Sequence, residues 1–136
     1  MASDGGNPGS GPHRARAAYF AAQAIATAGW WTAVAWAPAV RRVFAFGDAG
    51  ESLLPFLPAD MLLWVGGSLA AAWGEWSGAA WTPALRHALC GALACSVLHA
   101  VGLAIHKGAG WPGAVLMAPA LAITAWLTWQ ATPSGT

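Results

Sequence analysis

Four apolar segments that contain no Asp, Glu, Lys or Arg constrain this chain more than any other feature. They cover residues 17–40, 61–74, 88–105 and 111–130. A membrane-spanning helix needs about 20 predominantly apolar residues, and fewer where the bilayer thins or where flanking side chains reach the interface. The sequence therefore predicts an all-α membrane protein with four transmembrane helices, arranged as an up-down-up-down bundle because the connections between them are short.

The composition supports a membrane protein and argues against a soluble one. Of the 136 residues, 57% are hydrophobic and 8% are charged, whereas about 25% of the residues in a soluble domain are charged. A formal net charge of +1 offers no basic surface, so nucleic acid is not an expected partner. The bias toward Ala, Gly and Trp is typical of a high-GC genome, and we expect the protein in the bacterial inner (plasma) membrane.

The apolar segments also divide the chain into regions. Residues 1–16 are rich in Gly, Pro, Ser and Asn, which predicts a disordered N-terminal tail. Residues 17–130 form the transmembrane domain, and residues 131–136 form a short C-terminal tail. Four spans place both termini on one side of the membrane. The basic residues are shared equally between the two sides, so the positive-inside rule does not assign the orientation.

The second apolar segment is the shortest, and it is the predicted centre of helix packing. At 1.5 Å per residue it gives about 21 Å of helix, so we expect Asp60 and Glu75 at its two ends to lie near the lipid headgroups. The apolar stretch at residues 53–57 is expected to lie in the interface. Gly66 and Gly67 begin two rows of small residues at a spacing of four, and such rows allow close approach of a neighbouring helix.

One stripe on the third segment is the best candidate for a functional site. Cys95, His99, Gly102 and His106 follow helical spacing. His99 lies about 4 Å from the centre of the segment by helix rise, so it is predicted at membrane depth. Ionisable side chains at that depth are costly and often functional. We therefore expect His99 to face other helices, because a lipid-facing imidazole would lack a partner.

If the helices alternate in direction, several residues share the depth of His99. This candidate ligand-binding layer consists of Trp30, Trp31, Gly66, Gly67, His99 and Met117. In one interpretation the layer is packing, in which glycines make room for an indole and His99 bonds a free carbonyl. In the other it binds a flat or hydrophobic ligand such as a quinone, a haem or an isoprenoid tail. His99 and Met117 are then a conceivable axial pair for haem. The sequence does not identify the cofactor.

Catalytic and metal-binding motifs do not stand out in this sequence. Ser68 and His99 lack the local pattern of a nucleophile and its base. His87, His99 and His106 are spread over nearly 30 Å of helix at about 1.5 Å per residue, so we predict no shared metal. No catalytic residue is assigned.

Two hypotheses about function remain open. The first is a small polytopic integral membrane protein that acts as a structural or accessory subunit and binds a lipid-like ligand. The alternative is a membrane-embedded redox or lipid-modifying enzyme that uses His99. The expected partners are membrane lipids and, beyond them, a larger membrane complex or further copies of the chain in a homo-oligomer.

Overall fold

The computed structural model describes residues 11–45 and 51–130, and all regular structure in these two ranges is helical. The elements are α1 (Gly11–Trp36), α2 (Pro38–Phe44), the 3-10 helix η1 (Glu51–Phe56), α3 (Leu57–Asp60), the π-helix η2 (Met61–Gly66), α4 (Gly67–Ser77), α5 (Thr82–Lys107) and α6 (Trp111–Gln130).

Three helical stretches in the described part are long and apolar enough to cross a membrane. They are Leu53–Ser77, Thr82–Lys107 and Trp111–Gln130. The fourth expected span, on α1, does not reach the same apolarity. Its first turns carry His13, Arg14 and Arg16, and Gln23 and Thr27 follow further along. The structure thus supports a helical membrane protein with three such spans, and α1 is a more polar helix packed beside them.

The expected boundaries of the first helix, 17–40, are wrong at both ends. The helix begins at Gly11, so residues 11–16 of the expected tail are helical, and two of them contact a carboxylate of α4. It ends at Trp36 because Pro38 disfavours a helical conformation at the preceding residue. Ala37 is accordingly extended, with φ −116° and ψ 97°. The rest of the predicted tail, residues 1–10, and the C-terminal residues 131–136 lie outside the described residues.

The second helix is longer than expected because the stretch predicted to lie in the interface belongs to it. Helical structure runs without a break from Glu51 through η1, α3, η2 and α4 to Ser77. Pro55 and Pro58 lie near its start, where a missing N–H is best tolerated. Asp60 therefore lies about 14 Å along the helix and not at its end. The helix stops at Gly78, whose φ of 67° is the left-handed conformation that glycine adopts readily.

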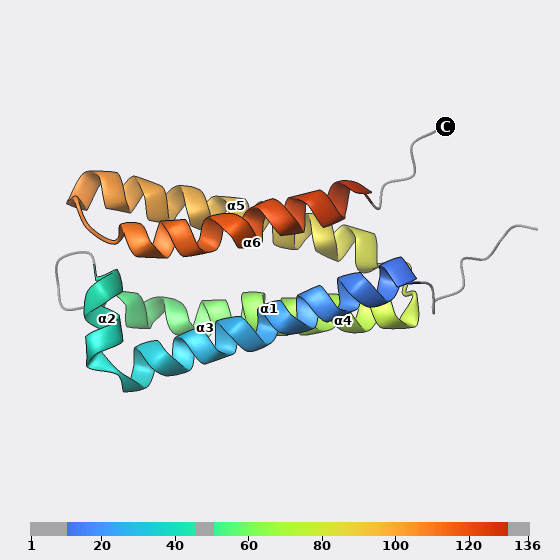
Figure 1. The fold of residues 1–136 in the computed structure, drawn as a ribbon, viewed down its shortest axis with the longest axis horizontal. Coiled ribbons are helices and arrows are strands. Elements are labelled where there is room, and N and C mark those ends of the chain that lie inside the picture. The colour runs from blue at the N-terminus through green and yellow to red at the C-terminus, as the bar shows by residue number, and fades with distance from the viewer. Residues whose placement is uncertain (1–10, 46–50, 131–136) are drawn as a thin grey trace, which may run out of the picture.

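The long helices form two antiparallel hairpins. In one, α1 packs against η2 and α4, and in the other α5 packs against α6. Successive long helices lie in opposite directions along the long axis, and the start of α1 and the end of α6 lie at the same end of the molecule (Figure 1). The buried core between the hairpins consists of Phe20, Trp64, Ala71, Leu89 and Leu93. The two hairpins are thus joined by one small apolar core.

Gly67 marks a close approach between the hairpins. A Cβ atom built on it would lie 2.8 Å from Cδ2 of Leu89. One of the two predicted rows of small residues, which includes Gly67 and the fully buried Ala71, therefore packs against α5. Gly66, which begins the other row, is exposed.

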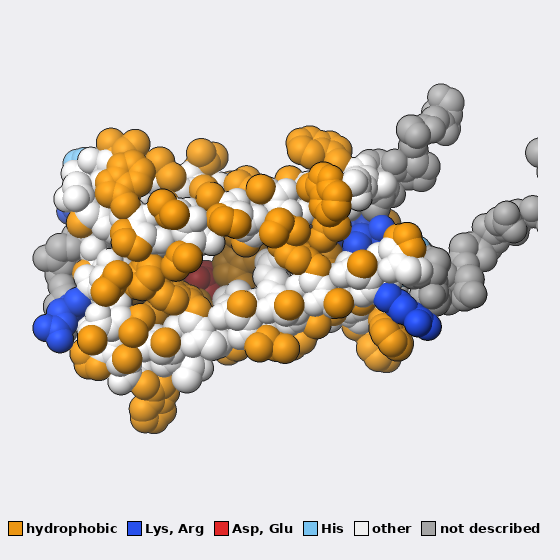
Figure 2. Space-filling view, viewed as in Figure 1, with side chains coloured by type: hydrophobic (Ala, Val, Ile, Leu, Met, Phe, Trp, Pro, Cys, Tyr) orange, Lys and Arg blue, Asp and Glu red, His pale blue; other side chains and the backbone are white. Residues whose placement is uncertain are grey.

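Large apolar side chains cover the outside of the bundle, and the cations gather toward its two ends (Figure 2). Exposed tryptophans also gather near the helix ends: Trp36 and Trp111 near one end, and Trp73, Trp76, Trp81, Trp126 and Trp129 near the other. A soluble protein does not expose this much apolar surface. Tryptophans at two levels are typical of the two interfaces of a bilayer. The outer surface therefore fits a lipid environment.

Candidate functional site

A cavity of about 620 Å³ lies between the two hairpins, and we call it the groove. Its lining residues come from α1, α2, α3, η2, α5 and α6, and they are Tyr19, Ala22, Gln23, Ala26, Thr27, Trp30, Trp31, Phe44, Asp60, Trp64, Leu93, Gly113, Leu116, Met117, Ala120 and Ile123. Figure 2 shows it as a hollow on the long side of the molecule, with an acidic side chain on its floor. The groove opens on a face that lipid chains would cover.

Among the described residues, Asp60 is the one acidic residue that lines the groove. Its Oδ2 accepts a hydrogen bond of 3.2 Å from Nε1 of Trp31. No Lys, Arg or His forms an ion pair with it in the described residues, which include all six Lys and Arg of the chain. A carboxylate accepts about four hydrogen bonds. Asp60 therefore has no basic partner among the described residues, and it has acceptor capacity beyond its bond to Trp31.

Aromatic side chains surround the carboxylate in the groove. Trp31 and Trp64 are almost fully buried. Trp30 packs edge-on against Phe44 of α2, with ring centroids 4.1 Å apart. These rings offer apolar walls, and aromatic faces also attract cations. The chemistry of the lining is that of a site for a bulky apolar molecule with one polar or positively charged group.

The π-helix η2 lies directly after Asp60 and carries Trp64 into the groove. A π-helical turn changes the angular position of the residues that follow it, and such turns are frequent at functional sites. Here Trp64 and Asp60, at a spacing of four, line the same cavity.

The structure brings together only part of the predicted ligand-binding layer. Trp30, Trp31 and Met117 line the groove. Gly66 and Gly67 do not, because the first is exposed and the second lies under Leu89. The ligand-binding role of the whole layer stays a prediction.

His99 does not lie where we expected. Its side chain is exposed, and its ring contacts Phe56, at 6.2 Å between ring centroids. The buried stripe of α5 contains Arg86, Leu89, Leu93 and Ala104. At 100° per residue, the stripe that contains His99 lies on the opposite side of the helix. The prediction that His99 faces other helices is met only by the contact with Phe56 of η1, because the rest of the side chain is exposed.

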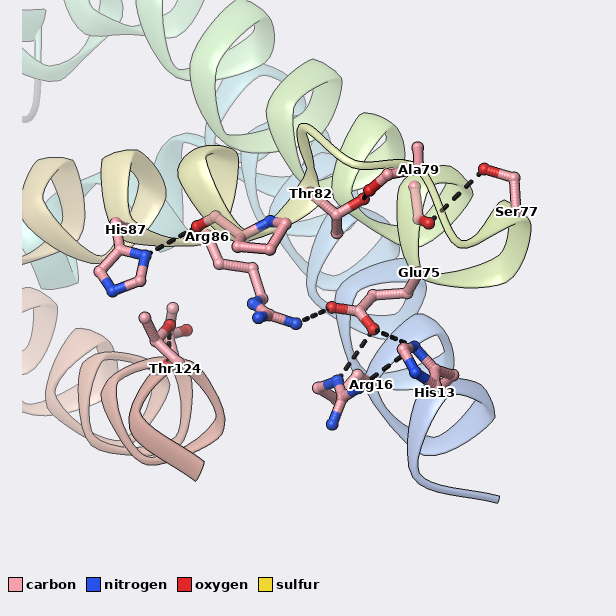
Figure 3. A network of polar contacts seen from close by, with 12 residues as sticks. His13, Arg16, Glu75, Ser77, Ala79, Thr82, Arg86, His87 and Thr124 are labelled. Carbon is pink, nitrogen blue, oxygen red and sulfur yellow. Dashed lines mark hydrogen bonds and ion pairs between the residues drawn. The ribbon is translucent and has the colours of Figure 1, made fainter. Parts of the chain in front are cut away.

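A second polar site lies at the end of the bundle where α1 begins and α6 ends. Glu75 of α4, only 1% exposed, is its centre. Arg16 of α1 donates from Nε to Oε2 of Glu75 at 2.8 Å, and Arg86 of α5 donates from Nη1 to Oε1. Nδ1 of His13 lies 3.1 Å from Oε2 (Figure 3). We call these four residues the Glu75 cluster, and it joins both hairpins.

The hairpins are also joined by a chain of hydroxyl groups near the same end. The Tyr19 hydroxyl donates to the carbonyl of Ala120 at 3.0 Å and lies 2.8 Å from Oγ1 of Thr124. The Thr124 hydroxyl in turn lies 3.4 Å from Oε1 of Gln23. Polar contacts thus fix the relative position of α1 and α6 beside the groove.

Sequence reasoning missed the two acidic sites for different reasons. Asp60 was expected at the lipid headgroups because the helix was limited to its uncharged residues, whereas Glu75 does lie near the end of its helix, and what was missed is its ion pairs. The apolar residues before Asp60 signalled that the helix starts earlier. The signal for the Glu75 cluster was the presence of Arg16 and Arg86 on the same side of the membrane in the predicted topology. The polar composition of residues 1–16 concealed it.

Metal coordination has no support in the described residues. Within 11–45 and 51–130, no three His, Cys, Asp or Glu side chains lie close enough together to hold a metal ion. Comparison with known proteins identifies no relative: no family model matches the chain, and no curated protein or solved structure is similar to it. The function is therefore inferred from the residues themselves.

Proposed function

We propose that this chain is a small integral membrane protein that binds a lipophilic cation, such as an amphiphilic amine, in the groove between its hairpins. The observation that carries the proposal is the Asp60 carboxylate, which lies in an aromatic-lined cavity without a basic partner in the described residues. Ionisable side chains within membrane spans usually serve a function and have a partner. Here the partner is a positively charged ligand.

Three properties of the groove support this ligand class. Its volume of about 620 Å³ lies within the range of small-molecule sites, about 300–1,000 Å³. Its walls are mostly apolar, which suits a hydrophobic body. Trp31 and Trp64 flank the region of Asp60, which suits a cation because aromatic faces and the carboxylate attract the same charge. The ligand reaches the groove from the bilayer, since the opening lies on the long side of the bundle (Figure 2).

The binding role is favoured over an enzyme built on His99. His99 lines neither the groove nor the cavity beside Glu75, and no nucleophile or second base accompanies it among its described contacts. In the proposal, α1 crosses the membrane as the fourth helix, because it packs along η2 and α4 and forms one wall of the groove. The accessory role in a larger complex or a homo-oligomer and the location in a bacterial inner membrane are part of the same proposal.

Blocking the groove tests its role. Purified protein in mild detergent is titrated with tetraphenylphosphonium, a bulky lipophilic cation, by isothermal calorimetry. Ala26 lines the groove and is exposed on α1, so Ala26→Trp places an indole at the opening. Ala18→Trp adds the same side chain at an exposed position of α1 outside the groove. We expect Ala26→Trp to weaken binding by at least about tenfold, or 1.4 kcal/mol, and Ala18→Trp to leave it unchanged.

The proposal fails if wild-type protein does not bind the cation above the background of empty detergent micelles. It also fails if both tryptophan variants bind it as wild type does. Thermal unfolding of each variant shows that a loss of binding is not a loss of fold.

A further inference from the structure

The Glu75 cluster borders a second cavity, of about 340 Å³, which is separate from the groove. It is lined by His13, Arg16, Gly74, Glu75, Gly78, Ala79, Ala80, Thr82, Pro83 and Arg86. The groove and this cavity share no lining residue. A ligand of this cavity is therefore independent of the ligand proposed for the groove.

The charges around this cavity do not balance. Arg16 and Arg86 carry two positive charges and Glu75 carries one negative charge, so the cluster has a net charge of +1 with His13 neutral and +2 with His13 protonated. No other acidic side chain among residues 11–45 and 51–130 lines the cavity. An excess of positive charge at the wall of a cavity favours an anionic ligand.

Arg86 also has a buried donor without a partner. The residue is 4% exposed, its Nη1 donates to Glu75, and its Nε has no hydrogen-bond partner in the described residues. Leaving a buried donor unsatisfied is unfavourable, and most such groups in native proteins bind a group of the protein, a water or a ligand. A guanidinium with free donors is the side chain best suited to phosphate oxygens.

The start of α5 adds to the positive potential. Thr82 and Pro83 begin this long helix and both line the cavity. The N-terminus of a helix carries partial positive charge, which favours an anion. The N–H of Thr82 already donates to the carbonyl of Ala79 and Pro83 has no N–H, so this contribution is that of the helix dipole. Trp76 and Trp81 are exposed next to the cavity, which places it at the level of lipid headgroups in a bilayer.

We propose that this cavity binds an anionic phosphate group, held by Arg86 and Arg16 while Glu75 keeps the two guanidinium groups in place. The phosphate is carried by the headgroup of an anionic lipid or is present as free phosphate in the aqueous phase. The two sources share the recognition chemistry, and the experiment separates them.

The experiment measures binding to the full-length protein in mild detergent by isothermal calorimetry. The probes are short-chain phosphatidylglycerol, short-chain phosphatidylcholine as its zwitterionic counterpart, and inorganic phosphate. We expect phosphatidylglycerol to bind at least about tenfold more tightly than phosphatidylcholine. Binding of phosphatidylglycerol without binding of millimolar phosphate assigns the site to a lipid headgroup, and comparable binding of inorganic phosphate assigns it to the free ion. Either result supports a phosphate site.

Two variants, Ala80→Glu and Arg86→Lys, and one control, Ala84→Glu, connect this binding to the cavity. Ala80→Glu adds a negative charge to the lining, and Ala84→Glu adds the same charge on an exposed position of α5 outside it. Arg86→Lys keeps the positive charge opposite Glu75 but removes Nε. We expect Ala80→Glu and Arg86→Lys each to weaken binding of the anionic probe by at least about tenfold and Ala84→Glu to leave it within about twofold.

The inference is overturned if the anionic and zwitterionic lipids bind equally and inorganic phosphate does not bind. It is also overturned if Ala80→Glu and Ala84→Glu bind the anionic probe alike. Thermal unfolding identifies any variant that is unfolded at the temperature of the titration. If Arg86→Lys is unfolded, Ala80→Glu decides the test, because Ala80 makes none of the contacts of the Glu75 cluster.

Discussion

The indole Nε1 of Trp31 donates a hydrogen bond of 3.2 Å to Oδ2 of Asp60, and this contact joins α1 to the second helix inside the groove. The indole thereby satisfies its single donor in a nearly closed environment. The carboxyl group keeps further acceptor capacity and has no basic partner among the described residues. This asymmetry makes Asp60 available to a ligand, while Trp31 fixes its position.

Replacing Trp31 by Phe separates these two roles. The variant loses the hydrogen bond but keeps an aromatic wall and the charge of Asp60. We expect it to lower the free energy of unfolding by about 1.5–3 kcal/mol, the range for a hydrogen bond to a charged group. The protein should keep its preference for a cation. Thermal unfolding in detergent measures the first effect, and Trp73→Phe on the exposed surface of α4 is the control. A variant as stable as this control would show that the contact contributes nothing.

Neutralising Glu75 should weaken the polar contacts that hold the two hairpins together. In Glu75→Gln, Arg16 and Arg86 lose their countercharge while Arg86 remains buried. Breaking a buried ion pair by removing one partner is destabilising by about 3–5 kcal/mol, so we expect a large drop in the unfolding temperature. Lys107→Gln removes an exposed charge at the other end of α5 and should have an effect within about 0.5 kcal/mol. Equal unfolding temperatures for the two variants would contradict a structural role of the cluster.

The close approach at Gly67 predicts a steric effect. A Cβ there would lie 2.8 Å from Leu89, whereas a Cβ at Gly91 would have no neighbour within 4 Å. Gly67→Leu should therefore destabilise the bundle by about 1–3 kcal/mol through overpacking, and Gly91→Leu should not. Gly67→Leu should also be more disruptive than Ala79→Leu in the loop after α4. Thermal aggregation in detergent ranks the three variants. Equal aggregation temperatures would contradict the claim that this helix is the centre of packing.

Because His99 is exposed, its replacement should have little effect on the stability of the bundle. Since His99→Leu removes a polar group from a surface facing lipid, it should change stability by no more than about 0.5 kcal/mol. Binding of tetraphenylphosphonium should be unchanged because His99 does not line the groove. Unfolding and titration of the purified variant check both points. Loss of binding would restore His99 as a functional residue.

The apolar segments predicted the helical membrane class from composition alone, because length and apolarity decide whether a helix can cross a bilayer. Segment boundaries were less predictable. The first helix ends before Pro38, although the apolar segment continues to residue 40. The second helix begins before Asp60, although Pro55 and Pro58 lie within its first residues. Proline acts through its position within a helix, and that position depends on where the helix begins.

The candidate site was only partly predictable because depth along a helix does not determine direction around it. Counting by helix rise placed Trp30, Trp31 and Met117 at one level, and these three residues do line the groove. The same count included His99, whose direction is set by the packing of the opposite face of α5. Spacing within one helix could not reveal which face its neighbours cover.

The charge preference of the groove tests the central claim most directly. Tetraphenylphosphonium and tetraphenylborate have the same shape and opposite charge, so the ratio of their dissociation constants reports the electrostatics of the site. Asp60→Asn keeps the size of the side chain and an oxygen that accepts from Trp31. Both probes partition into detergent micelles to the same extent with either protein, so this background cancels when the ratios for wild type and variant are compared. We expect Asp60→Asn to weaken binding of the cation relative to the anion by at least about tenfold. An unchanged ratio would contradict the role of Asp60 as the counter-ion of a cationic ligand.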